Sequence, residues 1–195
     1  MDSKIIKHFK KADPVLYKLI QRVGESKITL APRPPGQYFR SLCSTIISQQ
    51  LSGKVADLFW TRFLDLFPRR KITPQKVLGV SNSQLRAIGI SGSKAIYLKS
   101  LAEYFSKPNT RLSLLASLSH EEVISELTQI KGVGRWTAEM FLMFTLGRPD
   151  VFSAGDQGLK NALKKHYPSP PDPIIWSPYS TYACLVLWQS LELTS

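Results

Sequence analysis

The sequence predicts an all-α protein, and three features of the 195-residue chain lead to this fold class. Apolar residues recur at intervals of three and four along most segments, which is the periodicity of an amphipathic helix. Serine or threonine residues with helix-capping patterns precede several of these segments. No segment alternates apolar and polar residues in the way that a half-buried strand does. We expect about nine or ten helices from these signals.

The N-terminal part predicts helices on both sides of a proline-rich loop. Residues 1–22 carry apolar residues at helical spacing and predict one or two amphipathic helices. Three prolines in residues 31–36 predict an extended loop. Residues 37–48 predict a buried helix. The following helix is expected to begin at Ser52 as its cap, with Val55 among its inward-facing residues.

The middle of the chain shows two further helix starts and a turn. Thr73 precedes a proline at the first helical position, and Ser81 forms a capping box with Gln84. The glycines that follow predict a turn, and Lys94 after it is expected to lie near phosphate. Further helices are expected over residues 93–105 and 111–118.

A pair of helices joined by glycines follows. Ser119 and Glu122 form a capping box at the start of the first helix. Gly132 and Gly134 interrupt the helical pattern and allow a sharp reversal that leaves backbone amides uncovered. Such amides at a helix N-terminus can bind an anion such as DNA phosphate, and Arg135 adds positive charge there. The local pattern also fits a helical hairpin that only packs.

The C-terminal part predicts two more helices. Asp156 precedes a basic helix over residues 157–167, and Asp is a common helix N-cap. Ser177 is expected to cap the last helix, with Pro178 at its first position.

The composition indicates a polyanionic partner. Lys and Arg number 26 against 14 Asp and Glu, which gives a formal net charge of +12. This excess fits nucleic acid or an acidic membrane surface. No apolar run approaches the roughly 20 residues that span a bilayer, and the N-terminus lacks the features of a signal peptide. We therefore expect an intracellular protein that does not enter the membrane.

The cysteine and histidine counts argue against two kinds of metal site. Cys43 and Cys184 are the two cysteines of the chain and lie in apolar helical patterns, which predicts buried free thiols. An iron–sulfur cluster needs about four cysteines at short spacings. The three histidines are scattered and do not have the spacing of zinc ligands. We expect no iron–sulfur cluster, no zinc and no required cofactor.

Several ordered motifs together resemble a known family. The motif Leu-x-x-Ile-x-Gly-Val-Gly-Arg-Trp-Thr-Ala at residues 127–138 is followed by Val151–Asp156 and by a closing segment, Trp176–Trp188. This order resembles the helix-hairpin-helix DNA glycosylase superfamily, and within it the DNA-3-methyladenine glycosylase II group. The resemblance covers residues 38–190. It implies a two-lobed helical fold with a DNA-facing cleft between the lobes.

The resemblance also implies how the chain is divided. Residues 1–195 would form a single DNA glycosylase domain without an additional N-terminal domain. One lobe would span about residues 45–145, and the N-terminal and C-terminal segments would form the other.

The resemblance implies a monofunctional DNA glycosylase that excises alkylated purines, of the 3-methyladenine and 7-methylguanine type, in base-excision repair. Such an enzyme flips the base and hydrolyses its N-glycosidic bond. Asp156 stands where the superfamily carries its catalytic aspartate. Trp136 stands where members that also cut the DNA backbone carry a lysine, so no strand cleavage is expected.

The remaining site residues follow from the same resemblance. The base pocket would be lined by Trp136, Met140, Gln157, Tyr182 and Trp188. DNA would be contacted by Gln49, Gln50, Leu51, Gly132, Val133, Gly134, Arg135 and Thr137. Either Gln50 or Leu51 would fill the gap that a flipped base leaves in the duplex. Backbone carbonyls of Thr128, Ile130 and Val133 would bind Na⁺ or K⁺.

The partner implied is double-stranded DNA that contains damaged bases, bound by a monomer. Some departures leave the substrate range open, because Met140 stands where the group often has tyrosine. Two other functions remain as alternatives. One is a non-catalytic helix-hairpin-helix DNA-binding module, which would need neither Asp156 nor Gln50. The other is a glycosylase for other damaged or mismatched bases, which would differ only in its base pocket.

Overall fold

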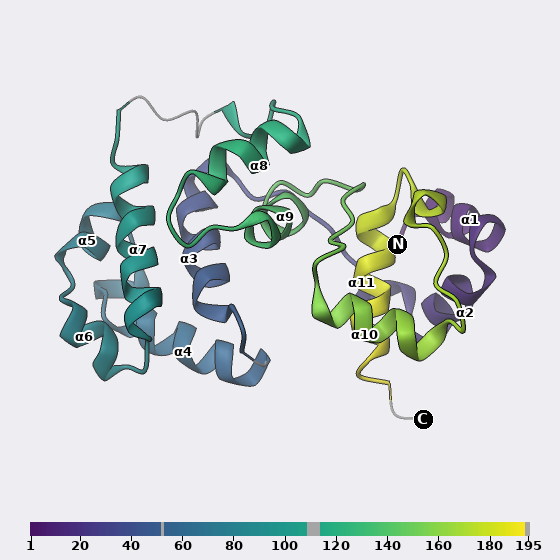
Figure 1. Cartoon of the computed structure of the whole chain (residues 1–195), viewed down its shortest axis with the longest axis horizontal. Helices are drawn as coiled ribbons and strands as arrows, with labels where there is room; N and C mark the ends of the chain where they lie inside the picture. Colours follow the sequence, from purple (N-terminus) through teal and green to yellow (C-terminus); the bar gives the residue numbers. More distant parts are fainter. Residues whose placement is uncertain (52, 109–113, 194–195) are drawn as a thin grey trace. The chain divides into compact units, whose positions relative to one another are not determined.

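A computed structural model describes residues 1–51, 53–108 and 114–193, and every regular element in these ranges is a helix (Figure 1). The predicted fold class is therefore confirmed for the described part of the chain. The predicted Ser52 cap lies outside these ranges, and the helix predicted over residues 111–118 begins outside them. The chain forms two compact units, and α9 (Arg135–Phe144) runs from one into the other.

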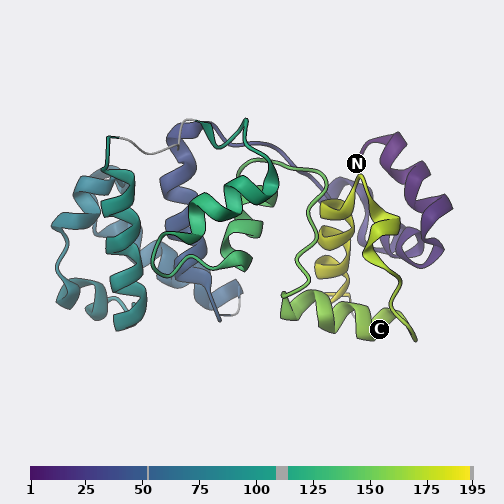
Figure 2. The same cartoon turned by 45° about the horizontal axis from the view of Figure 1, so that its top comes forward.

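The first unit comprises Met1–Pro32 together with Leu142–Ser195. Its elements are α1 (Ser3–Ala12), α2 (Pro14–Val23), the short 3-10 helix η1 (Glu25–Lys27), α10 (Gln157–His166), η5 (Pro173–Trp176) and α11 (Ser180–Ser190). Helix α11 packs against both α2 and α10, so the N-terminal and C-terminal segments of the chain lie side by side (Figure 2). The helical pattern of residues 1–22 thus corresponds to two helices.

A buried carboxylate holds three segments of this unit together. Asp13 is 4% exposed and caps α2 by accepting a hydrogen bond from the Leu16 amide at 3.0 Å. Its Oδ2 also accepts hydrogen bonds from the Tyr167 hydroxyl at 2.7 Å and from Trp176 Nε1 at 2.8 Å. Three donors satisfy the buried carboxylate, which is the condition for burying such a group without a large penalty.

The second unit is Arg33–Phe141. Its elements are η2 (Pro35–Gln37), α3 (Tyr38–Ser48), α4 (Gly53–Asp65), η3 (Pro68–Arg70), α5 (Pro74–Gly79), α6 (Asn82–Ala87), α7 (Gly92–Phe105), α8 (His120–Thr128) and most of α9. Helix α7 packs against α3, α5 and α6 and is the central helix of this unit. The predicted helix starts at Thr73 and Ser81 are both confirmed, and the Ser81–Gln84 capping box is present.

Two details of the predicted elements are wrong. Val55 is 39% exposed, because α4 buries only Phe63 and Leu64 near its C-terminal end. The last helix begins at Ser180 and not after Ser177, whose hydroxyl instead donates a hydrogen bond to Asp150 Oδ2 at 2.6 Å. Asp150 also accepts from the Ser180 amide at 3.1 Å, so a carboxylate distant in sequence sets this helix start.

The prediction of buried free thiols is confirmed, since Cys43 and Cys184 are both buried and carry no disulfide. Burial raises the pKa of the Cys43 thiol far above its usual range. In the described part of the chain, no helix is long and apolar enough to cross a membrane.

Candidate functional site

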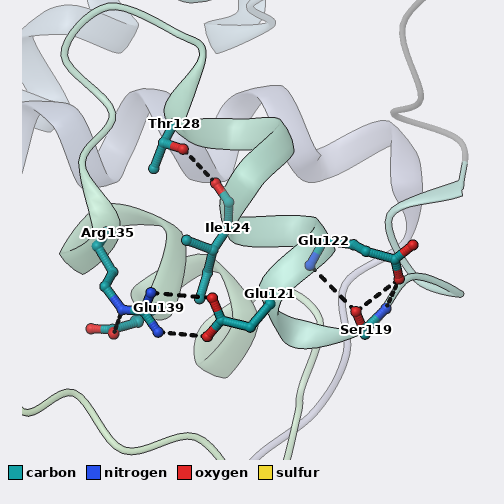
Figure 3. A network of polar contacts seen from close by, with 7 residues as sticks. All are labelled: Ser119, Glu121, Glu122, Ile124, Thr128, Arg135 and Glu139. Atoms are coloured by element: carbon teal, nitrogen blue, oxygen red, sulfur yellow. Dashed lines mark hydrogen bonds and ion pairs between the residues drawn. The ribbon is translucent and has the colours of Figure 1, made fainter.

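The glycine hairpin is held by a capping box at the start of α8 and by an ion pair between the first turn of α8 and Arg135 (Figure 3). Ser119 caps α8 by accepting a hydrogen bond from the Glu122 amide, and the Glu122 carboxylate accepts one from the Ser119 amide at 2.8 Å. After α8 the chain reverses through Gly132, which has a φ of 90°. Helix α9 then begins at Arg135. The predicted arrangement of two helices joined by a glycine turn is therefore present.

The two glycines of this turn are in different surroundings. A Cβ on Gly132 would lie 2.0 Å from Cγ of Tyr97, so the backbone passes directly against the tyrosine ring. Gly134 has no heavy atom within 4 Å of the position of a Cβ. Gly132 is thus required both for its positive φ and for close approach, whereas neither reason applies at Gly134.

Arg135 is paired inside the hairpin. Its guanidinium donates to both carboxylate oxygens of Glu121, at 2.6 and 3.2 Å, and to Glu139 at 3.1 Å (Figure 3). These partners lower the positive charge that Arg135 offers to an anion. The hydrogen bond from Arg135 also lowers the pKa of the Glu121 carboxyl. Any anion at this helix start would depend mainly on the backbone amides.

The loop after α3 is tied to the hairpin by a glutamine. Gln49 Nε2 donates to the Gly132 carbonyl at 3.1 Å and to the Thr137 hydroxyl at 3.0 Å. Thr137 is 1% exposed, and its hydroxyl and the Gln49 side chain are hydrogen-bonded to each other. These contacts favour a positioning role for both residues over direct contact with DNA. Gln50 is exposed and has a left-handed φ of 58°, and Leu51 is half-buried. Of the two plug candidates, Gln50 is the more accessible.

The carboxylate that the sequence singles out stands at the start of α10. Asp156 Oδ1 accepts a hydrogen bond from the Leu159 amide at 2.7 Å, which makes Asp156 the N-cap of this helix. The same oxygen accepts a second hydrogen bond from Trp188 Nε1 at 2.9 Å. Asp156 is partly exposed. A carboxylate held by a helix start and an indole has a defined orientation.

Two residues next to Trp188 were missed by the sequence analysis. The Phe144 ring is 41% exposed and lies 5.9 Å from the Trp188 ring, measured between centroids. Gly158 leaves room for the hydrogen bond between Asp156 and Trp188, since a Cβ at this position would lie 3.0 Å from Asp156 Oδ1 and 3.1 Å from Trp188 Nε1. Phe144 gave no signal among the apolar residues of its helix. Gly158 could have been noticed, because a glycine inside a helix usually has a packing or functional reason.

The other residues predicted for the base pocket have varied positions. Trp136 is half-buried, whereas Met140 is only 6% exposed. Gln157 is exposed and donates to Asn161 on the same helix at 2.9 Å. Tyr182 packs against Tyr179, with ring centroids 6.3 Å apart, and lies about 9 Å from Trp188 along the axis of α11. Within its unit, Asp156 is therefore brought together with Trp188 and not with Tyr182.

The carbonyls predicted to bind a monovalent cation belong to the hairpin. The Ile130 carbonyl accepts a hydrogen bond from the Val133 amide at 2.9 Å, which leaves it a second lone pair. The Thr128 side chain points back into α8 and donates to the Ile124 carbonyl at 2.8 Å (Figure 3). Carbonyl oxygens are hard ligands of the kind that Na⁺ and K⁺ accept. Among the described residues, no group of three or more His, Cys, Asp and Glu side chains is placed to hold a metal ion.

Comparisons with known proteins agree with this geometry. A family model described as HhH-GPD superfamily base excision DNA repair protein matches residues 43–174. DNA-3-methyladenine glycosylase 1 of Schizosaccharomyces pombe is 32% identical over 197 residues, which are 95% of this chain and 86% of that protein. The Bacillus subtilis protein YfjP is 31% identical over 169 residues, which are 79% of this chain and 59% of YfjP.

A solved structure supports the fold independently. It is the S. pombe 3-methyladenine DNA glycosylase Mag1 in complex with abasic DNA, which is 31% identical to this chain. The two structures superpose with a TM-score of 0.83, and the match covers 98% of each chain. The fold is therefore shared with that protein.

Proposed function

The chain belongs to the HhH-GPD superfamily of base excision DNA repair proteins, and from this premise we propose that it is a DNA glycosylase. The observation that carries the proposal is the arrangement of Asp156. Its carboxylate caps α10, is oriented by the Trp188 indole and remains partly exposed. Asp13 is also a helix cap with an indole donor, but it is only 4% exposed, so accessibility is what distinguishes Asp156.

The proposed reaction is hydrolysis of the bond between a damaged base and deoxyribose. The C1′–N bond breaks and its electron pair leaves with the base, so positive charge develops on the sugar. The Asp156 carboxylate stabilises this charge, as carboxylates do for oxocarbenium-like transition states. Water then bonds to C1′ and loses a proton, for which Asp156 is the acceptor. The products are a free base and an abasic site.

We propose alkylated purines as the substrates. Relatives and a structural neighbour are described as 3-methyladenine glycosylases. Purines alkylated at N3 or N7 are cationic, and an electron-rich aromatic face attracts such a base by about 1–2 kcal/mol when water is excluded. Trp188, which donates to Asp156, and the exposed ring of Phe144, which lies against Trp188, supply such faces.

The proposed activity includes no strand cleavage. Trp136 stands where superfamily members that cut the backbone carry a lysine, and an indole cannot form the Schiff base that such cleavage needs. The partner is double-stranded DNA, bound by a monomer. Gln50 is proposed as the plug, and Na⁺ or K⁺ as an ion held by the Thr128, Ile130 and Val133 carbonyls. The substrate implies a location with the genome, in the nucleoid region of a bacterial cytoplasm or in a nucleus.

The deciding experiment measures release of methylated bases from alkylated duplex DNA. Asp156→Asn keeps a good helix cap and an acceptor for Trp188, but it removes the charge. We expect the wild type to release 3-methyladenine and to leave abasic sites without strand breaks. The variant should be slower by about a hundredfold or more, with an unchanged melting temperature.

A matched control is available in the same unit. Asp172 caps η5 by accepting from the Ile174 amide at 3.0 Å, so Asp172→Asn makes the same change of charge at another cap. This variant should retain wild-type activity. Equal activity of Asp156→Asn and the wild type would contradict the role of Asp156. DNA binding without release of any alkylated, oxidised or mismatched base would favour the non-catalytic module.

A further inference from the structure

Lys94 is half-buried against the loop that carries the proposed duplex plug. It lies in the first turn of α7, and its ammonium donates to the Ile47 carbonyl at 2.7 Å and to the Gln49 carbonyl at 2.8 Å. These carbonyls belong to the end of α3 and to the following loop, where helix carbonyls have no partner within the helix. Two of the three ammonium donors of Lys94 therefore go to protein carbonyls, and the phosphate contact expected from the sequence stays a prediction.

The same face of α7 also contacts the hairpin. Tyr97 is three residues after Lys94, so the two side chains are neighbours on one side of the helix. The Tyr97 ring packs directly against Gly132. Gln49 completes the connection, because its side chain donates to the Gly132 carbonyl while its own carbonyl accepts from Lys94. Helix α7 thus contacts both the loop after α3 and the hairpin, and it fixes their positions relative to each other.

The contacts surround an open space. A cavity of about 710 Å³ is lined by both loop glutamines, by Lys94 and Tyr97 and by the hairpin glycines. The hydrogen bonds of Lys94 and Gln49 therefore connect the loop after α3 to α7 and to the hairpin, which also line this cavity. Gln50 is exposed at its end in the left-handed conformation, which is uncommon for a residue other than glycine and persists only where the surroundings maintain it.

We propose that Lys94 is a positioning residue that holds Gln50 in place for insertion into the duplex when the damaged base leaves it. The inference rests on the proposed function. Burial lowers the pKa of Lys94 because the ammonium has lost part of its hydration, and the Ile47 and Gln49 carbonyls are the acceptors that replace some of that water. Without this ammonium the end of α3 would lose two hydrogen bonds, and the loop would no longer be fixed relative to the hairpin.

The chain offers a matched control on the same helix. Lys99 donates to the carbonyls of Val77, Leu78 and Val80 at the end of α5. It therefore makes the same kind of ammonium–carbonyl hydrogen bonds at a helix end, but away from the plug loop. Lys94→Met and Lys99→Met each remove one such ammonium and keep a flexible apolar stem. A loss of stability alone would affect both variants in the same way.

The test compares excision of 3-methyladenine from duplex and from single-stranded DNA under single-turnover conditions. A plug is needed only where a base must leave a paired stack. Lys94→Met should lower the duplex rate about tenfold or more while changing the single-strand rate by less than about twofold, because unpaired bases need no plug. Lys99→Met should leave the ratio of the two rates unchanged. Lys94→Arg, which retains donors, should restore part of the duplex rate.

A second readout does not require excision. Fluorescence of 2-aminopurine beside an abasic-site analogue in a duplex reports unstacking when a plug enters. The wild type and Lys99→Met should raise this signal, and Lys94→Met should not. Equal ratios and equal signals for the two variants, with an active wild type, would overturn the role of Lys94 and leave the glycosylase proposal intact. A wild type that shows neither excision nor insertion would remove the proposed function and this inference with it.

Discussion

At the scale of single residues, the site depends on side chains that serve two partners at once. Asp156 caps a helix and accepts from Trp188, and both hydrogen bonds use the same oxygen. Gln49 donates to a carbonyl and to a hydroxyl of the hairpin. Such sharing fixes the orientation of a side chain more strictly than one hydrogen bond can, which is what a reacting carboxylate needs.

Gly158 gives a residue-scale prediction in which activity and stability separate. Gly158→Ala would place a methyl group within 3.1 Å of both Asp156 Oδ1 and Trp188 Nε1, so one of the two must move. We expect base release to fall about tenfold or more, because small misplacements of a catalytic group are costly. Alanine is the better helix former by up to about 1 kcal/mol, so unfolding in urea should show no loss of stability.

The matched variant for this test is Gly155→Ala. Gly155 has no heavy atom within 4 Å of the position of a Cβ, and its φ does not require glycine. Its activity should stay close to that of the wild type. If both variants kept full activity, the space above Gly158 would have no part in positioning Asp156.

At the scale of elements, the sequence signals were most reliable where the interaction is local. The capping boxes at Ser81 and Ser119, and the caps at Thr73 and Asp156, are all present. Each depends on groups within three or four residues of one another, so the sequence alone contains both partners. The start of α11 was predicted wrongly because Asp150, 30 residues before Ser180, accepts from its amide and from its hydroxyl.

The hairpin gives the element-scale prediction. Gly132→Ala would require a positive φ and a contact with Tyr97 far inside van der Waals distance. We expect it to lower the free energy of unfolding by about 2 kcal/mol or more and to weaken DNA binding. Chemical denaturation and duplex binding measure the two effects. Gly134→Ala, which meets no atom, should change stability by less than about 1 kcal/mol.

A double variant distinguishes the two causes at Gly132. Adding Tyr97→Gly to Gly132→Ala removes the contact, including the Tyr97 Cβ that would lie 2.5 Å from the new methyl group, but leaves the positive φ. Part of the lost stability should return relative to the sum of the two single changes. Full additivity would mean that the backbone conformation alone makes glycine necessary.

At the scale of the whole molecule, the net charge of +12 should govern how duplex DNA is bound. Cations that neutralise phosphates release counterions, so affinity falls as salt rises. We expect duplex affinity to decrease at least about tenfold between roughly 50 and 200 mM salt, as neutralisation of two or more phosphates implies. Fluorescence anisotropy over a salt series measures the slope. An affinity that stays flat over this range would exclude binding through the DNA backbone.

The stability of the folded chain should fall in alkaline solution. Burial and the hydrogen bond to Asp13 raise the pKa of Tyr167, and burial with a hydrogen bond to Glu126 raises that of Tyr104. An unfolded tyrosine loses its proton near its ordinary pKa of 10.0, while the folded one retains it. The contribution of these two tyrosines to the free energy of unfolding is therefore complete below pH 10 and is lost as the pH rises above it.

Urea unfolding between pH 8 and 11 would test this. Tyr167→Phe should be less stable at pH 8, because Asp13 loses a donor, and its stability should decline less steeply above about pH 10. Tyr17→Phe, a change in the same unit at a hydroxyl that accepts from Gln21, should keep the wild-type slope. Parallel slopes for Tyr167→Phe and the wild type would contradict the assignment.

The helical class, the helix starts that depend on local caps and the family resemblance could all be predicted from the sequence. Hydrophobic period and capping act over a few residues, so a single sequence contains all the information they need. The exposure of Val55, the pairing of Arg135 with Glu121 and the hydrogen bond from Lys94 to the Gln49 loop could be seen only in the folded structure. These outcomes depend on residues that are far apart in the chain and become neighbours only when the helices pack.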